Sequence, residues 1–231
     1  GVAVPVKLTE LVQDMAYTLA AGTLDTDITA LEYDSRKVVP GSLFVCLTGF
    51  QADGHDYIPK ALEAGAAALV VEREAAVPAG ITVLRVEDSR AALALLASAW
   101  FGHPAREMTL IGLTGTKGKT TTAHMLKAIL EAAGHKVGMI GTIGALIGQE
   151  KVSTKNTTPE SYELHALFRR MADAGCGYVV MEASSQGFKL RRTAGISFDI
   201  GVFLNLSPDH IGPGEHESFE EYLQCKSLMF R

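Results

Sequence analysis

The sequence has little cysteine, a single tryptophan and no excess of positive charge. Lys and Arg number 21 against 26 Asp and Glu, so the formal net charge is −5, which argues against a nucleic-acid partner. The three cysteines, Cys46, Cys176 and Cys225, stand far apart in the chain. They therefore form neither a disulfide framework nor a pair with metal-ligand spacing, and they fit a reducing cytoplasm.

Long apolar runs are also absent. No segment has the uninterrupted apolar length of a membrane span, and the N-terminus lacks the basic-then-apolar pattern of an export signal. From these absences we expect a cytoplasmic protein with neither a nucleic acid nor a membrane as partner, and we expect a monomer. The hydrophobic content of 47% is enough for a sizeable core, and 231 residues allow one or two domains.

The most informative stretch is LIGLTGTKGKTTT, residues 110–122. It reads as a buried strand, a glycine turn and the start of a helix, an arrangement that offers backbone N–H groups and a partial positive charge to a phosphate. Lys119 can reach the β- and γ-phosphates of a nucleotide, and the Thr120 hydroxyl can ligate Mg²⁺. The general P-loop spacing is not kept, because Leu113 stands where a glycine is usual, so an ordinary glycine turn is the alternative.

The helix after this turn is predicted to be amphipathic and to end at Gly134, a residue suited to a C-terminal cap. Its apolar face is expected to consist of Ala123, Leu126, Ile129, Leu130 and Ala133.

Two further strand ends carry polar side chains. Residues 178–181 read as a buried parallel strand with Glu182 at its carboxyl end, and residues 199–204 read as another, followed by His210. Ligands gather at the carboxyl ends of parallel strands, so we expect Lys119, Glu182 and His210 to surround one ligand, with Glu182 holding Mg²⁺. The alternatives are a strand-end acid paired with a Lys or Arg, and a structural histidine.

The first part of the chain reads as a small α/β unit that ends near Pro104. Strands are predicted at 28–33, 42–47, 66–71 and 81–86, and helices at 7–15, at 57–64 and after an N-cap at Asp88-Ser89. Its informative parts are two polar loops, Asp34–Arg36 and Gly49–Asp56. By themselves these favour a solvated surface and a structural Asp–Arg pair.

In the second part, a strand at 136–140 precedes a hairpin in which 142–147 pairs with Val152 across Gly148-Gln149. A helix then follows with Thr158 as N-cap and Pro159 as first residue. Its apolar face is expected to consist of Leu164, Leu167, Phe168 and Met171.

The loop TGTKGKTT resembles the nucleotide loop of the Mur ligases and folylpolyglutamate synthetases, ATP-dependent amide-forming enzymes that depart from the general spacing in the same way. Over most of the chain the sequence is similar to the MurE-type Mur ligases, through DSRKVVPGSLFVCLTGFQADGHDYIPKALEAGAAALVVE, NTTPE and MEASSQGFKLRR. The resemblance implies an α/β chain with a small N-terminal UDP-binding domain, residues 1–104. It also implies an incomplete P-loop parallel-sheet ATPase domain, residues 105–231.

The resemblance also implies the roles of individual residues. The ATP-binding residues would be Gly115, Thr116, Lys117, Gly118, Lys119, Thr120 and Thr121. The residues that contact UDP-N-acetylmuramoyl-dipeptide would be Ser35, Phe50, Gln51, Ala52, Asn156, Thr157, Thr158, Ser184 and Arg192. The Mg²⁺ ligands would be Thr120, Glu182, His210 and a carbamylated Lys226, and the catalytic set would be Lys119, Glu182, His210 and Lys226.

The implied reaction joins a free amino acid to the UDP-linked dipeptide through an acyl phosphate. Two alternatives are a MurF-type ligase, against which NTTPE and EASSQG argue, and a non-catalytic UDP-sugar-binding module on the same scaffold. The chain ends at Arg231, soon after Lys226, whereas the family continues into a C-terminal domain. We therefore expect a fragment with little ligase activity of its own.

Overall fold

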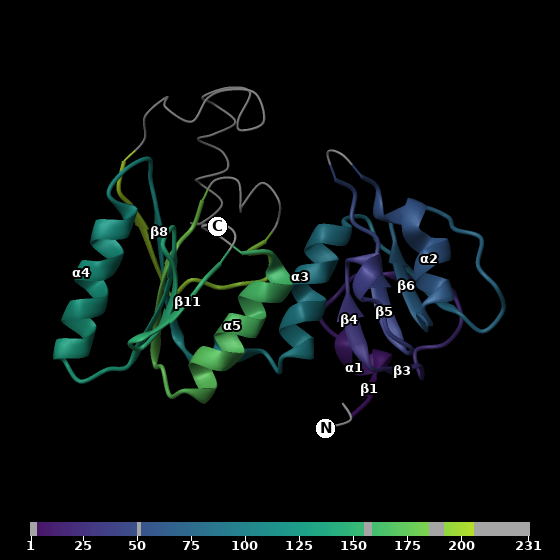
Figure 1. Ribbon diagram of the computed structural model, residues 1–231, viewed down its shortest axis with the longest axis horizontal. Helices are drawn as coiled ribbons and strands as arrows, with labels where there is room; N and C mark the ends of the chain where they lie inside the picture. Colours follow the sequence, from purple (N-terminus) through teal and green to yellow (C-terminus); the bar gives the residue numbers. More distant parts are fainter. Residues whose placement is uncertain (1–3, 50–51, 155–158, 185–191, 206–231) are drawn as a thin grey trace. The chain divides into compact units, whose positions relative to one another are not determined.

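The computed structural model describes residues 4–49, 52–154, 159–184 and 192–205. This part of the chain forms two compact units that divide between Trp100 and Phe101. Each unit contains a mainly parallel sheet with helices, so the α/β class expected from the sequence is confirmed (Figure 1). Pro104, where the sequence predicts the boundary, begins the 3₁₀ helix η3 (Pro104–Glu107) of the second unit.

The first unit contains a five-stranded sheet in the order β2-β7-β6-β5-β4, in which β2 alone is antiparallel to its neighbour, and a two-stranded β1-β3 pair. Its strands are β1 (Val6–Lys7), β2 (Thr18–Ala21), β3 (Asp27–Ile28), β4 (Ala30–Glu32), β5 (Ser42–Val45), β6 (Ala68–Val71) and β7 (Thr82–Arg85). Its helices are α1 (Leu8–Leu11), η1 (Ser35–Lys37), η2 (Gly54–Tyr57), α2 (Ile58–Glu63) and α3 (Ser89–Trp100).

Burial explains why the central strands of this unit read as continuous apolar runs. Every residue of β5 and β6 is buried, as expected for parallel strands that are covered on both faces. Ile58 and Ala61 of α2 pack in one core cluster with Phe44 and Leu69. The predicted cap of α3 is confirmed, because Asp88 Oδ1 accepts the backbone N–H groups of Arg90 and Ala91 at 3.0 and 3.1 Å.

The first unit differs from the prediction near its N-terminus. The helix expected at 7–15 is the single turn α1, because the backbone leaves the helical region at Val12 and the Met15 N–H donates to the Val12 carbonyl at 3.1 Å. The strand expected at 28–33 is split into β3 and β4, which pair with different partners. The edge strand β2 was not predicted, since its TLAA sequence is mostly exposed and does not alternate.

The second unit contains a six-stranded sheet in the order β11-β10-β9-β12-β8-β13. Its strands are β8 (Thr109–Thr114), β9 (Val137–Gly141), β10 (Gly144–Ile147), β11 (Glu150–Val152), β12 (Tyr178–Glu182) and β13 (Ile200–Phe203). The four strands β9, β12, β8 and β13 run parallel, and the predicted hairpin is confirmed as the antiparallel pair β10-β11.

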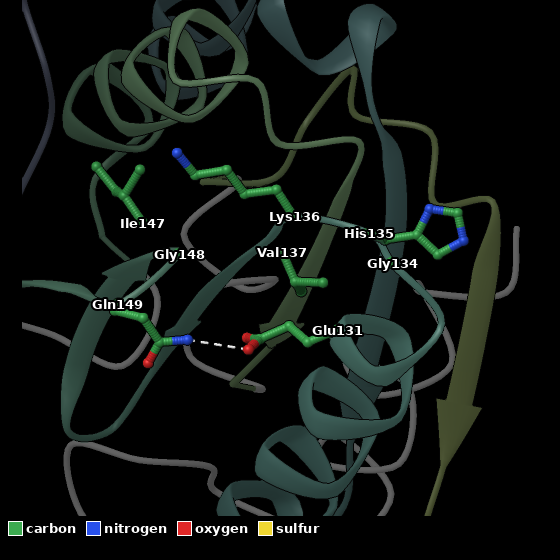
Figure 2. Close-up of a pocket in the computed structure, with 8 residues that line it drawn as sticks. All are labelled: Glu131, Gly134, His135, Lys136, Val137, Ile147, Gly148 and Gln149. Carbon is green, nitrogen blue, oxygen red and sulfur yellow. Dashed lines mark hydrogen bonds between the residues drawn. The ribbon is translucent and has the colours of Figure 1, made fainter.

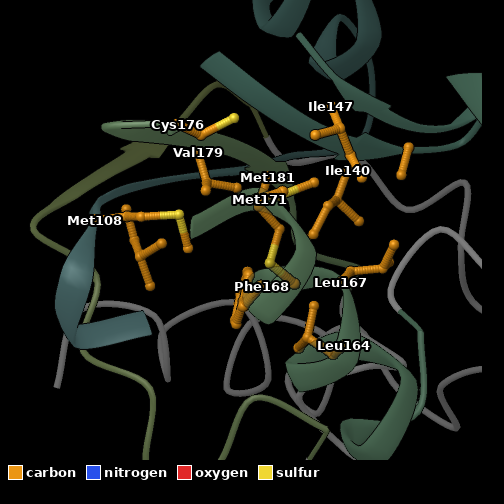
Figure 3. Packing of buried hydrophobic residues seen from close by; sticks show 12 residues of the cluster. Met108, Ile140, Ile147, Leu164, Leu167, Phe168, Met171, Cys176, Val179 and Met181 are labelled. Atoms are coloured by element: carbon orange, nitrogen blue, oxygen red, sulfur yellow. The ribbon is translucent and has the colours of Figure 1, made fainter. Parts of the chain in front are cut away.

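Two helices cover the two faces of this sheet, α4 (Lys119–Ala132) on one side and α5 (Ser161–Asp173) on the other (Figure 1). Alternate residues of each strand therefore enter different cores. On the α5 side, Phe168 and Met171 pack with Val179 and Met181 of β12 (Figure 3). On the α4 side, Ala123 packs in a cluster with strand residues that include Ile111, Leu113 and Val180.

The buried stripe of α4 differs from the predicted one. Ile129 is 62% exposed, whereas Lys127 is only 6% exposed and forms an ion pair with Glu131. The lysine takes the place of an apolar residue, because its charge is matched by the carboxylate one turn away. Gly134 does end the helix as predicted, with φ of +94° and its N–H donated to the Glu131 carbonyl.

The start of α5 also differs from the prediction. The helix begins at Ser161, since Glu160 precedes it with a non-helical ψ of 154°, and the predicted first residue Pro159 lies outside the helix. The predicted cap Thr158 lies outside the described residues. The apolar face of α5 is as predicted, with Leu164, Leu167, Phe168 and Met171 all buried.

In the described part of the chain, no helix combines the length and apolar character needed to span a membrane.

Candidate functional site

The predicted phosphate loop connects β8, which ends at Thr114, to α4, which begins at Lys119. Gly115 and Gly118 have φ of +146° and +85°, values in the left-handed region that favours glycine. The first N–H groups of α4 have no intrahelical acceptor, and the helix dipole adds a partial positive charge at the same point. The local geometry is therefore that of an anion-binding helix N-terminus.

Glu182 lies next to this loop, because β12 and β8 are parallel neighbours and Glu182 pairs in register with Leu113. The carboxylate is fully buried and held by three donors. Its Oε1 accepts the Thr120 hydroxyl at 3.0 Å and the Thr142 hydroxyl at 3.3 Å, and its Oε2 accepts the Thr142 N–H at 3.1 Å. The carboxylate is therefore fixed at the N-terminus of α4.

Lys119 brings a positive charge to the same place. Burial lowers the pKa of its ammonium, and the nearby Glu182 carboxylate opposes that shift. The structure thus brings Lys119, Thr120 and Glu182 together, as the sequence predicts. His210, the third predicted strand-end group, lies outside the described residues.

The residues present fit a Mg²⁺ ion. Thr120 Oγ1 and Glu182 Oε1 lie 3.0 Å apart, and both are the hard oxygen donors that Mg²⁺ prefers. Among the described residues no group of three or more His, Cys, Asp or Glu side chains could hold a metal by itself. Mg²⁺ commonly binds through one or two carboxylates and completes its shell with water and phosphate oxygens, so two protein donors are sufficient.

Asn205, to which the sequence analysis gave no role, contacts the loop directly. Its Oδ1 accepts the N–H groups of Thr116 and Lys117 at 2.8 and 2.9 Å, and its Nδ2 donates to the Lys117 carbonyl at 2.8 Å. Asn205 follows β13 and Thr142 follows β9, both at carboxyl ends of parallel strands. The rule that ligands gather at the carboxyl ends of parallel strands, which identifies Glu182, therefore also identifies Asn205 and Thr142.

The two predicted substrate-contact residues at the end of this sheet have different environments. Arg192 Nη2 donates to Glu160 Oε1 at 2.9 Å, and the Arg192 side chain is only 11% exposed. Ser184 is half-buried just beyond β12. The Arg192 guanidinium is thus already engaged, through Nη2, by a carboxylate within the chain.

In the first unit, the Asp34–Arg36 loop is built around a two-pronged ion pair. Arg36 Nε and Nη2 donate to the two Asp34 oxygens at 3.0 and 2.8 Å, and these bonds hold the pKa of Asp34 at about 2. Asp34 also caps η1 by accepting the Arg36 N–H. Ser35, the predicted diphosphate contact, is the half-buried first residue of η1, so its backbone is fixed by this pair.

The second predicted loop is fixed at its base by buried polar contacts. His55 Nδ1 donates to Asp53 Oδ1 at 2.7 Å, and its Nε2 accepts the Glu72 N–H at 3.0 Å. The Glu72 side chain accepts both the N–H and the hydroxyl of Ser89 at 2.9 Å and the Thr48 hydroxyl at 3.2 Å. Glu72 therefore joins the loop to the N-terminus of α3, a connection the sequence did not indicate.

Replacing Glu72 by alanine is expected to destabilise the first unit by about 2 kcal/mol, because the N–H and hydroxyl of the buried Ser89 lose a charged acceptor. Urea unfolding followed by fluorescence measures this, since the single tryptophan, Trp100, lies at the end of α3 in the same unit. The exposed Glu74 provides the matched control, Glu74→Ala. Equal midpoints for the two variants would contradict the proposed anchoring.

The remaining predicted site residues are distributed as follows. Ala52 is exposed and its carbonyl accepts the Gly49 N–H at 2.8 Å. The residues outside the described part of the chain are Phe50, Gln51, Asn156, Thr157, Thr158, His210 and Lys226.

A pocket of about 520 Å³ lies at the other end of α4, away from the phosphate loop. Figure 2 shows Gln149 hydrogen-bonded to Glu131 there, whereas the side chains of Lys136 and His135 point away from each other. Because its polar groups do not converge, we do not assign the pocket a ligand.

A glycine turn that leads from a parallel strand into a helix, beside a carboxylate on the neighbouring strand, defines the second unit as an α/β domain of the P-loop type. The chain belongs to the Mur ligase family. Residues 113–231 match the family described as the Mur ligase middle domain, and residues 27–101 match the description "Mur ligase family, catalytic domain".

Individual proteins agree with this assignment. The UDP-N-acetylmuramoyl-L-alanyl-D-glutamate–2,6-diaminopimelate ligase of Clostridium perfringens (strain 13 / Type A) is 44% identical over 223 residues, which are 96% of this chain and 46% of that protein. A solved structure of a ligase with the same name has a TM-score of 0.79 at 25% identity, and the match covers 98% of this chain and 45% of that one. The chain thus spans about half the length of these relatives.

A second solved structure, the MurF ligase from Thermotoga maritima in complex with ADP, is less similar. It has a TM-score of 0.54 at 26% identity, and the match covers 87% of this chain and 42% of that one.

Proposed function

We propose that this chain is the part of an ATP-dependent amide ligase that binds Mg·ATP and UDP-N-acetylmuramoyl-L-Ala-D-Glu. The whole protein would add the third amino acid of the peptidoglycan peptide in the cytoplasm, and the names of the relatives favour diaminopimelate as that amino acid. The observation that carries the proposal is the 3.0 Å contact between Thr120 and the buried Glu182, beside the partly buried Lys119.

The proposed reaction has two steps. The terminal carboxylate of the UDP-dipeptide attacks the γ-phosphorus of ATP, ADP leaves, and an acyl phosphate forms. The amine of the incoming amino acid then attacks the acyl carbon, phosphate leaves, and one proton is released from the nitrogen. The first step brings anions together, so positioning and charge neutralisation contribute most of the rate enhancement.

Each residue has a defined part in this proposal. Lys119 neutralises charge on the β- and γ-phosphates, and the N–H groups at the start of α4 bind phosphate oxygens. Thr120 and Glu182 hold Mg²⁺, which when bound supplies positive charge to the phosphate oxygens. His210 and a carbamylated Lys226 are further proposed Mg²⁺ ligands.

The substrate-binding residues of the proposal lie in both units. Ser35, Phe50, Gln51 and Ala52 would bind the UDP part, and Asn156, Thr157, Thr158, Ser184 and Arg192 the peptide part. Two observations support this set: the fixed backbone at Ser35, and the mostly buried Arg192 guanidinium, whose Nη2 donates to a carboxylate.

Two alternative functions remain testable. The MurF-type alternative requires binding of the UDP-tripeptide, and the higher TM-score of the diaminopimelate ligase argues against it. A non-catalytic UDP-sugar module requires no ATP binding, and the buried Thr120–Glu182 contact argues against that.

The proposal is tested by calorimetric titration of the 231-residue chain with Mg·ATP and, separately, with the UDP-dipeptide and UDP-tripeptide. We expect binding of Mg·ATP and of the UDP-dipeptide. Lys119→Ala should weaken Mg·ATP binding at least about tenfold, because it removes the phosphate-binding ammonium. The exposed Lys151 on β11 provides the control Lys151→Ala for the loss of one charge. Absence of ATP heat with the wild-type chain would refute the proposal.

A further inference from the structure

We propose that Asn205 is a positioning residue that holds the phosphate loop in its binding shape and links it to the end of β13. This inference rests on the function proposed above, but its central claim concerns the loop itself. Asn205 forms three side-chain hydrogen bonds to the loop, all between 2.8 and 2.9 Å.

The approach of Asn205 is set by strand register. Phe203 of β13 pairs with Thr114 of β8, and the Leu204 N–H donates to the Thr114 carbonyl at 2.9 Å. Leu204 and Gly115 are therefore the next residues on the two chains, and after them the Thr116 N–H donates to the Asn205 backbone carbonyl at 3.3 Å. A Cβ at Gly115 would lie 3.0 Å from Asn205 N and 3.1 Å from Leu204 Cβ, so the absence of a side chain at this glycine allows the close approach.

Only a primary amide matches the three bonds. Oδ1 accepts two N–H groups while the adjacent Nδ2 donates to a carbonyl, and the opposite amide orientation would place like groups together in all three contacts. Aspartate could accept from both N–H groups but could not donate when ionised. Alanine could do neither.

The contacts divide the loop into two parts. The N–H groups of Thr116 and Lys117 are used by Asn205, whereas those at the start of α4 have no intrahelical acceptor. In this arrangement Asn205 orders the first half of the loop so that the second half faces the phosphate. The loss of conformational entropy on ordering the loop then occurs during folding, before the nucleotide binds. Binding itself loses less entropy, so the affinity is higher.

The direct test is hydrogen exchange of the Thr116 and Lys117 amides, measured by NMR without nucleotide. In Asn205→Ala the Lys117 amide should exchange at least about tenfold faster, because its side-chain acceptor is removed. The Thr116 amide should be affected less, because it also donates to the Asn205 backbone carbonyl at 3.3 Å, which the substitution keeps. Gln149→Ala removes another hydrogen-bonded amide side chain, at the far end of α4, and should leave both rates unchanged. Wild-type exchange rates in Asn205→Ala would overturn the proposal.

The consequence for binding is tested separately with Mg·ATP. Asn205→Ala should bind Mg·ATP at least about tenfold more weakly than the wild-type chain. Asn205→Asp keeps a side-chain oxygen that accepts the Thr116 and Lys117 N–H groups, so it should protect both amides from exchange. Its carboxylate repels the Lys117 carbonyl, so full affinity for Mg·ATP should not be restored. Faster exchange with unchanged affinity would overturn the positioning role. Absence of Mg·ATP binding by the wild-type chain would instead refute the ATP-dependent function, and the exchange result would stand.

Discussion

Replacing Gly141 by alanine is expected to weaken Mg·ATP binding about a hundredfold, or about 2.7 kcal/mol. A Cβ at this position would lie 1.8 Å from Glu182 Oε2 and 2.7 Å from Glu182 Cδ. The carboxylate cannot move aside without loss, because it is fully buried and accepts bonds from Thr120 and Thr142. The added methyl group must therefore displace the residue that we propose as a Mg²⁺ ligand.

A comparison of ATP binding with and without Mg²⁺ distinguishes displacement of Glu182 from a general disruption of the nucleotide site. ATP without Mg²⁺ should bind to Gly141→Ala no more weakly than to the wild-type chain, because displacing a carboxylate does not remove a phosphate ligand. Calorimetry in the presence and absence of Mg²⁺ measures the difference. Equal loss of affinity under both conditions would contradict a metal-binding role for Glu182.

Two other glycines provide matched controls, Gly138 in β9 and Gly177 just before β12. A Cβ at Gly138, on the same strand, would lie 2.5 Å from Met171 Sδ, so Gly138→Ala overpacks the core without touching Glu182. A Cβ at Gly177 would meet nothing within 4 Å. We expect both variants to bind Mg·ATP with wild-type affinity, although Gly138→Ala should be less stable.

The glycine turn, its helix and the buried strands could be predicted because each has a local signal. Lys119 follows β8 after the glycine turn, and Glu182 is the last residue of β12. The carboxyl ends of parallel strands lie at one edge of a sheet, so the proximity of the two residues is expected from the strand pattern. Thr142 and Asn205 obey the same rule. Their side chains carry no charge that would mark them in the sequence, although these neutral side chains supply positioning bonds.

Other features depend on contacts between distant parts of the sequence and have no local signal. Lys127 appears as a solvated helix charge in the sequence, but it is buried because Glu131 pairs with it. The Glu72 anchor joins three segments of the first unit. Helix ends near Val12 and Glu160 were misplaced, since backbone turns and side-chain partners elsewhere override local propensity.

Acidification from pH 6.5 to pH 4 is expected to destabilise the second unit by about 3 kcal/mol through His165 alone. This residue of α5 is 1% exposed, and neither ring nitrogen has a hydrogen-bond partner among the residues that the structure describes. Burial, with a smaller contribution from His103, lowers its pKa from 6.5 to about 4. The unfolded chain therefore binds the proton more tightly, and stability that is present above pH 6.5 is lost as the pH falls towards 4.

His165→Leu should remove most of this pH dependence and should be at least as stable as the wild type at pH 7.5, because it eliminates two buried nitrogens without partners. Leucine is of similar volume but gives up the edge-on contact with Phe168, whose ring centroid is 5.6 Å away. Hydrogen exchange in peptides of α5, corrected for the intrinsic pH dependence of exchange, reports the second unit, whereas Trp100 fluorescence reports the first. His124→Gln, at an exposed position on α4, is the control.

The carboxyls of Asp34 and Asp53 do not obscure the measurement. Hydrogen bonds hold the pKa of each at about 2, from Arg36 in one case and mainly from the His55 N–H in the other. Their contribution to stability is lost only below about pH 4, as the pH falls through these values, and both residues lie in the first unit. A His165→Leu variant with the wild-type pH dependence between 6.5 and 4 would show that this histidine is not the group that titrates.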